Sequence, residues 1–141
     1  MTALRVGNPD RQYSAIARED PTCIYLVVNG SLTTPDGEPM GAGKIASQAF
    51  QAALWLLTDP GVPGDVAQRV RDWQAEGART VTRVAKTPAA FARVLDEVPG
   101  LVLADEGLTE VDRGALTVFC SWPVRRSQAP KILSHKRIPL L

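Results

Sequence analysis

The chain is poor in the residue types that bind metals or staple small folds together. Its 141 residues include two cysteines, one histidine and two methionines. A structural zinc site uses four ligands at characteristic spacings, and two isolated cysteines with one histidine do not supply them. Cys23 and Cys120 both lie in apolar stretches that are typical of strands, so we predict that both are small buried hydrophobic residues.

Long apolar runs are absent as well. No run approaches the roughly 20 residues that a transmembrane helix needs. Residues 1–12 lack the apolar core of a secretory signal, so we expect a cytoplasmic protein that does not insert into membranes. The hydrophobic content of 45% is sufficient for a core, and the length favours one domain.

The net charge is also small, because the chain contains 16 basic and 15 acidic residues. This balance alone does not indicate a nucleic-acid partner. The distribution is less even, since residues 122–141 contain no acidic residue and five basic ones: Arg125, Arg126, Lys131, Lys136 and Arg137. Such a tail fits phosphate contacts, but taken alone it is more typical of a solvated tail, and both interpretations stay open.

Strand and helix patterns alternate along the chain. Residues 23–28, 79–84, 101–104 and 115–122 read as strands, and residues 44–57, 65–76, 88–98 and 130–135 as helical segments. We therefore predict an α/β fold: a small mixed sheet of about four strands, with helices packed on both faces. Residues 1–20 are predicted to form an N-terminal arm or a short added element, and residues 21–141 a single domain.

Three local signals refine this pattern. Asp65 is placed to cap the second helix, and Thr87 followed by Pro88 is a strong start signal for the third. In the first helix, apolar residues such as Phe50 and Trp55 widen the hydrophobic stripe. We therefore expect this helix to be buried on more than one side.

The most informative stretch is M-G-A-G-K-I-A-S-Q, from Met40 to Gln48. Lys44 stands at the start of a helix, where the helix dipole disfavours a cation by up to about 1 kcal/mol. An anion opposite this lysine, either a carboxylate or a phosphate, would offset that cost. A lysine that simply extends into water is the alternative.

Nucleotide-binding loops fit this stretch poorly. Residues 41–46 match G-x-G-x-x-A, but about a dozen residues separate the motif from the preceding strand. A phosphate-binding loop would need glycine in place of Glu38 and Ser or Thr in place of Ile45. A nucleotide cofactor is therefore not expected.

A second stretch, L-A-D-E-G-L-T-E, follows a short apolar strand. Asp105 comes directly after that strand, and Gly107 allows a tight turn. Ends of strands and starts of helices commonly form the ligand crevice of α/β proteins. Asp105 is thus either a turn residue or the anion that Lys44 requires.

With both motifs in order, residues 23–141 resemble the type II peptidyl-tRNA hydrolases. That family is similar in M-G-x-G-K-I-A-x-Q, in D-x-G-x-T and in a following G-x-x-T strand. The resemblance implies a homodimeric ester hydrolase that releases a peptide from the terminal ribose of tRNA, with no metal or organic cofactor. It also implies a catalytic role for Lys44, Asp105 and Thr109, and substrate contacts by the set Gln48, Gly41, Gly43 and Gly107.

Two positions that are basic in the family are Ala42 and Leu108 here. Three outcomes stay open: tRNA affinity is lower, the basic C-terminal tail replaces these contacts, or the fold has another role. The alternatives to a tRNA hydrolase are an inactive module that binds tRNA or a protein, and an esterase or amidase that acts on smaller acyl substrates.

Overall fold

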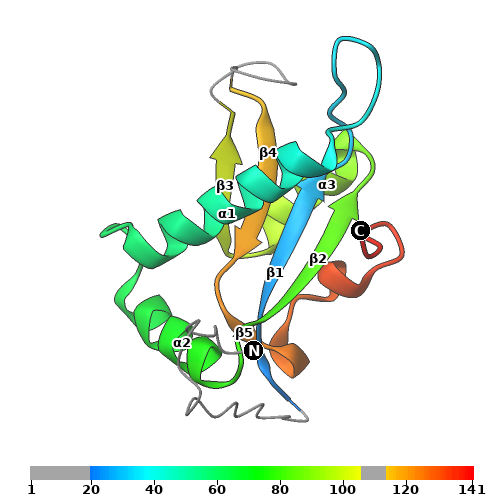
Figure 1. Ribbon diagram of the computed structural model, residues 1–141. Helices are drawn as coiled ribbons and strands as arrows, with labels where there is room; N and C mark the ends of the chain where they lie inside the picture. The colour runs from blue at the N-terminus through cyan, green and yellow to red at the C-terminus, as the bar shows by residue number, and fades with distance from the viewer. Residues whose placement is uncertain (1–19, 106–113) are drawn as a thin grey trace, which may run out of the picture.

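The computed structural model describes residues 20–105 and 114–141 (Figure 1). Its helices and strands follow the predicted alternation closely. In chain order they are β1 Thr22–Asn29, α1 Ala42–Thr58, α2 Gly64–Ala75, β2 Arg79–Ala85, α3 Pro88–Glu97, β3 Gly100–Ala104, β4 Leu116–Ser121 and β5 Val124–Arg125, followed by the short 3-10 turns η1 Arg126–Gln128 and η2 Lys131–Ser134.

The sheet is mixed, with the order β2-β1-β4-β3. β1 is parallel to β2 and antiparallel to β4, and β3 is antiparallel to β4. β5 adds two residues that pair with the beginning of β1. Because β1, β2 and β3 all run in the same direction, their carboxyl ends meet at one edge of the sheet.

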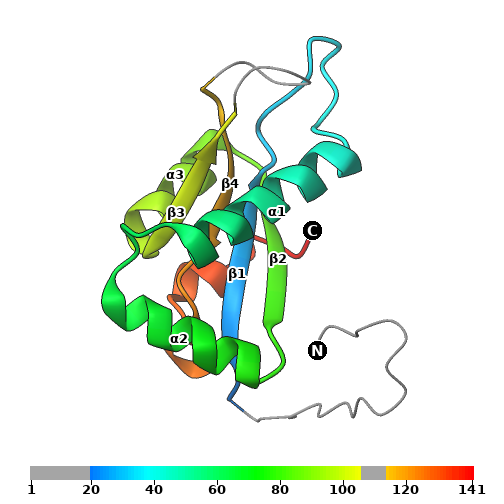
Figure 2. The same ribbon diagram turned by 60° about the vertical axis from the view of Figure 1, so that its left-hand side comes forward.

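Alternating residues of β1 face two separate cores. Tyr25 and Val27 pack with residues of α3 and of the C-terminal segment, whereas Ile24 packs with residues of α1 and α2. Figures 1 and 2 show the same division, with α1 and α2 on one face of the sheet and α3 on the other. The prediction of helices on both faces of a mixed sheet is therefore confirmed.

Helix α3 begins as its sequence predicts. The Thr87 side chain accepts a hydrogen bond of 3.1 Å from the backbone N–H of Ala90, and Pro88 occupies the first helical turn. Phe91 and Val94 are buried against the sheet. After α3, Gly100 is the first residue of β3. A Cβ atom at this position would clash with the carbonyl oxygen of Cys120, so only glycine fits there.

Helix α1 corrects one expectation. It buries Gln48, Ala52 and Leu56, one residue per turn, against the sheet. Phe50 and Trp55 are 69% and 54% exposed, so burial on more than one side is wrong for the single chain. The reason is geometric, since the sheet covers one side of α1 and no other described element lies on its outer side.

Other expectations are corrected in detail. The cap of α2 is Pro63 rather than Asp65, which lies inside the first turn and pairs with Arg69 at 2.9 Å. The sheet contains a fifth strand, β5, in addition to the four predicted ones. This strand was not predicted because its two residues are too few to produce a sequence pattern. The helical segment expected at 130–135 is the 3-10 turn η2.

Both cysteines are buried, as predicted, and both have free thiol groups. Burial raises the pKa of the Cys120 thiol to about 12, because the thiolate would lose its hydration inside the sheet. None of the helices in the described residues has the length and hydropathy of a membrane span. The prediction for an arm at residues 1–20 lies almost entirely outside the described part of the chain.

Candidate active site

The site begins where the chain enters α1. Met40 is buried in a small apolar cluster with Val28 and Val118, and Ile45 packs against the same cluster. Apolar residues on either side of a helix start fix the angle at which the chain enters the helix. Gly41 is the N-cap residue and provides no side-chain cap, and the first turn contains no acidic residue.

Lys44 lies in that first turn and forms an ion pair with Asp105. Its Nζ atom donates a hydrogen bond to Oδ1 of the aspartate. The two side chains are only 8% and 3% exposed. Buried lysines and aspartates are rare unless they are paired, so each of these charges is held in place by the other.

Asp105 is fixed by its own backbone as well. It follows β3 directly, its N–H donates to the carbonyl oxygen of Ala115 at 2.8 Å, and its carbonyl oxygen accepts from the N–H of Gly114 at 2.7 Å. Gly114 has a φ of +84°, a conformation that favours glycine. The carboxylate is therefore presented at the carboxyl end of β3 by a backbone that is hydrogen-bonded on both sides.

One turn beyond Lys44, Gln48 faces the same end of the sheet. It is 4% exposed, and its Oε1 atom accepts a hydrogen bond of 2.5 Å from the hydroxyl of Thr117 in β4. Thr117 is fully buried. The stripe of α1 that faces the sheet thus changes from the apolar residues Ala52 and Leu56 to two polar residues at the start of the helix.

Asn29 ties the end of β1 to this edge. Its side-chain amide donates to the carbonyl oxygen of Leu116 at 2.9 Å, and its Oδ1 atom accepts from the backbone N–H and the hydroxyl of Ser31. These bonds connect β1 to the start of β4, two strands that pair along the sheet. The edge that carries Asp105 is therefore braced by side-chain hydrogen bonds in addition to the ladder.

The structure brings Lys44 and Asp105 into contact. Of the two anions expected opposite this lysine, a carboxylate or a phosphate, the structure therefore contains the carboxylate. The other predicted residues that the structure describes, Gln48, Gly41 and Gly43, all lie in the first two turns of α1 or at its cap. Gly43 is exposed, and a Cβ atom added there would meet nothing within 4 Å. Gly107 and Thr109 lie outside the described residues.

Thr117 is the threonine of the G-x-x-T strand, but sequence reasoning assigned it no role. A threonine between apolar residues of a strand signals a buried hydroxyl that needs a partner. The sequence does not say which residue that partner is, because Gln48 and Thr117 are 69 positions apart. Groups of three or more potential metal ligands do not occur among residues 20–105 and 114–141.

Chemically, the arrangement combines a cation, a carboxylate and the positive end of a helix at one point. Such a point stabilises negative charge that develops on an oxygen, while the carboxylate can accept a proton. The fold and the site together define a small mixed-sheet α/β protein with a buried lysine–aspartate pair at the start of its first helix.

Residues 22–138 match the peptidyl-tRNA hydrolase PTH2 family. The match spans most of the chain, and the protein belongs to that family. The sequence-based identification of the family is therefore confirmed. Among curated proteins, none matches the chain in a sequence search.

Proposed function

We propose that this protein hydrolyses the ester bond between a peptidyl group and the 3′-terminal ribose of tRNA. Membership of the family supports this activity in general. The observation that carries the proposal for this chain is the buried contact between Lys44 and Asp105 at the start of α1. A buried ion pair is not needed to hold a helix on a sheet, since apolar residues of similar volume do so at least as well.

In the proposed mechanism, Lys44 stabilises the transition state. As water adds to the ester carbonyl, negative charge develops on the carbonyl oxygen. The ammonium group and the amino end of α1 present positive charge from a site that is largely shielded from solvent. Removing one such donor typically costs about 2.7–4 kcal/mol in activation free energy.

Asp105 acts on the water. Its carboxylate accepts a hydrogen bond from the water and takes a proton as the water oxygen bonds to the carbonyl carbon. When the bond from that carbon to the ribose oxygen breaks, the proton passes to the departing oxygen. The products are a peptide with a free carboxylate, one proton released to solvent, and tRNA with a free 3′-terminal hydroxyl.

The remaining residues are assigned to substrate binding. Gln48 is held by Thr117 through Oε1, so the orientation of its amide group is fixed before substrate binds. Gly43 is exposed beside Lys44, and open space lies above it. We propose that substrate lies against this first turn, where a side chain would obstruct it. Contacts by Gly41 and Gly107 and a catalytic role for Thr109 stay predictions.

Release of tRNA from N-acetylphenylalanyl-tRNA tests the activity. We expect multiple turnovers by the purified protein, and a loss of at least about 100-fold in kcat for Lys44→Met. Binding of tRNA without turnover would contradict the hydrolase proposal and favour a binding module. Equal turnover of short acyl esters that lack tRNA would favour an esterase of broad substrate range.

We also propose that the protein is a homodimer that acts in the cytoplasm, where translation produces its substrate. Phe50, Leu54 and Leu57 recur at helical spacing on the outer face of α1, with Trp55 beside them, and all four are exposed. Large apolar side chains that are exposed side by side commonly mark an interface. Light scattering should give twice the mass of one chain, and a Phe50→Ser/Trp55→Ser variant should be monomeric; a monomeric wild-type protein would contradict this.

A further inference from the structure

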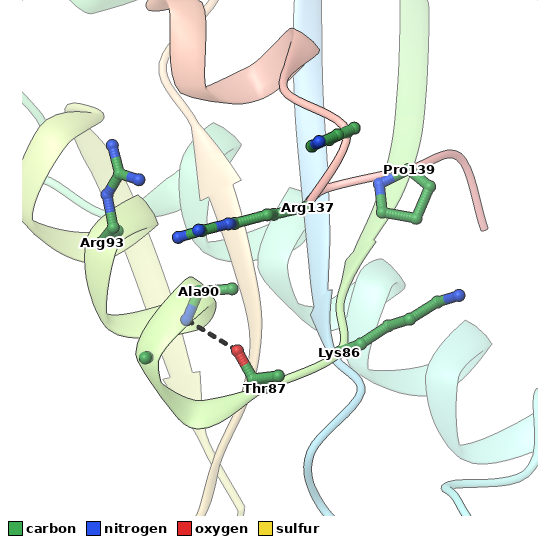
Figure 3. A pocket seen from close by; sticks show the side chains of 8 residues that line it. Lys86, Thr87, Ala90, Arg93, Arg137 and Pro139 are labelled. Carbon is green, nitrogen blue, oxygen red and sulfur yellow. Dashed lines mark hydrogen bonds between the residues drawn. The ribbon is translucent and has the colours of Figure 1, made fainter.

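A basic pocket lies on the face of the sheet opposite α1, between the start of α3 and the C-terminal segment (Figure 3). Its volume is about 320 Å³. None of its eight lining residues is acidic, and four are basic: Lys86, Arg93, Lys136 and Arg137. The mechanism proposed above uses none of them.

The four cations come from three separate parts of the fold. Lys86 follows β2, Arg93 lies on α3, and Lys136 and Arg137 belong to the C-terminal segment. In Figure 3 the side chain of Arg137 extends toward the beginning of α3 above Ala90, Arg93 stands farther along that helix, and Lys86 extends on the other side of Thr87. Like charges gathered by the fold from distant parts of the chain repel each other unless an anion lies between them.

Most of this charge is not neutralised within the described residues. Arg93 pairs with Glu97 at 3.0 Å on the surface of α3. The ion pairs found among residues 20–105 and 114–141 do not include Lys86, Lys136 or Arg137. The positive end of the α3 dipole adds to the same field. Guanidinium groups bind phosphate oxygens in a two-pronged geometry, which makes phosphate the best-matched anion.

A second pocket extends the basic surface along the C-terminal segment. It measures about 160 Å³, and Tyr25, Arg83, Arg126 and Ser134 contribute polar groups to its lining. The Nη1 atom of Arg83 donates to the carbonyl oxygen of Ile138 at 3.0 Å, and Ile138 is the neighbour in sequence of Arg137 in the first pocket. The Nε atom of Arg83 is buried without a hydrogen-bond partner among the described residues. The two pockets together contain six basic side chains, a number that suits a chain of phosphates better than one small anion.

We propose that this surface, from Arg126 to Lys86, binds backbone phosphates of the tRNA whose acylated end lies at Lys44 and Asp105. The inference rests on the proposed function. Lys86 and Asp105 follow the outer strands β2 and β3, whose carboxyl ends share one edge of the sheet. Three inter-strand steps of ~4.8 Å place the ends of these two strands about 14 Å apart along the sheet, which is the length of about four stacked nucleotides.

The test compares two substrates and a matched control variant. N-acetylphenylalanyl-tRNA carries backbone phosphates, whereas N-acetylphenylalanyl-adenosine carries none. Arg137→Glu reverses a charge in the pocket, and Lys131→Glu makes the same change at an exposed position of η2 that lines neither pocket. We expect Arg137→Glu to raise KM for the tRNA substrate at least about 10-fold with kcat unchanged, and to leave the adenosine substrate unaffected.

Binding of deacylated tRNA, followed by fluorescence anisotropy, gives a second readout. Arg137→Glu should make the plot of log affinity against log salt concentration less steep by about one phosphate contact, while Lys131→Glu should leave it unchanged. Arg137→Lys keeps the charge and should retain most of the affinity. A general defect in folding would instead impair both substrates together.

The outcomes separate the two proposals. If the protein hydrolyses tRNA esters but Arg137→Glu behaves like Lys131→Glu, the phosphate surface is wrong and the hydrolase proposal stands. If the protein never hydrolyses them but Arg137→Glu weakens tRNA binding, the surface stands and the hydrolase proposal falls. Displacement of tRNA by micromolar inorganic phosphate would indicate a site for a small anion and would overturn the inference.

Discussion

Replacing Lys44 with methionine should reveal how tightly this lysine and Asp105 are coupled. Methionine keeps much of the length of the lysine stem but removes the charge that faces the carboxylate. Since the aspartate side chain is only 3% exposed, water cannot readily replace the ammonium group. The carboxylate would then be a buried charge without its lysine partner.

The expected cost is large for one substitution. Breaking a buried ion pair by removing one partner typically destabilises a protein by about 3–5 kcal/mol. Asp105→Asn should also be destabilising, because it leaves the lysine charge without its carboxylate. The double variant, Lys44→Met with Asp105→Asn, contains neither charge. Its unfolding free energy should therefore exceed that of Lys44→Met by at least about 2 kcal/mol.

Urea unfolding of the four proteins in this cycle measures the coupling energy. The exposed pair between Arg69 and Asp65 on α2 provides the matched control, because its side chains are 39% and 73% exposed. The same cycle on that pair should give no more than about 1 kcal/mol. Hydrolysis of N-acetylphenylalanyl-tRNA, measured in parallel, should stay lost in the double variant although its stability is restored.

Two results would refute this reasoning. A coupling energy as small as that of the control pair would mean that the charges are solvated and do not form a buried site. Recovery of hydrolysis in the double variant, together with its stability, would mean that the pair is structural and takes no part in the reaction.

Three further predictions follow from the same structure. Thr117→Val should lower the unfolding free energy by about 1–3 kcal/mol, because Gln48 loses its buried hydrogen-bond donor. It should also raise KM for the tRNA ester, because the amide of Gln48 is then no longer held in one orientation. An unchanged KM would exclude a positioning role for Thr117. Gly43→Ala should leave thermal stability unchanged or raise it slightly, because alanine favours a helix more than glycine does. It should lower kcat/KM, since the open space above this residue is assigned to substrate. Full activity would contradict that assignment. Between pH 9 and about 12 the unfolded protein releases the Cys120 proton while the folded protein keeps it, so the unfolding free energy should fall as pH rises, by up to about 1.4 kcal/mol per pH unit. Urea titrations at several pH values should show a smaller slope for Cys120→Ala. An unaltered slope would mean that another group titrates in this range.

Local signals were sufficient for much of the fold. Thr87 and Pro88 identify the start of α3 because a hydroxyl cap and a fixed φ act within a few residues. The alternation of strands and helices likewise predicts a mixed sheet with helices on both faces. Asp65 misled because a helix can begin at Gly64 just as well, with the aspartate inside its first turn.

Long-range arrangement was predictable only where a residue was out of place. Lys44 stands where the helix dipole opposes it, and this misfit predicted an anion opposite the lysine, either a carboxylate or a phosphate. The apolar outer face of α1 was read as buried, because a sequence does not say which element covers a stripe. The role of Thr117 was unpredictable for a related reason, since its partner Gln48 lies on α1, 69 positions earlier in the chain.

The central claim is that Lys44 and Asp105 together break an acyl–ribose bond, and single-turnover hydrolysis of N-acetylphenylalanyl-tRNA tests it most directly. With enzyme in excess over substrate, the rate reports the chemical step at the pair. We predict that Lys44→Met slows this step at least about 100-fold while the protein stays folded and still binds tRNA. A folded Lys44→Met protein that hydrolyses the substrate at the wild-type rate would contradict the claim.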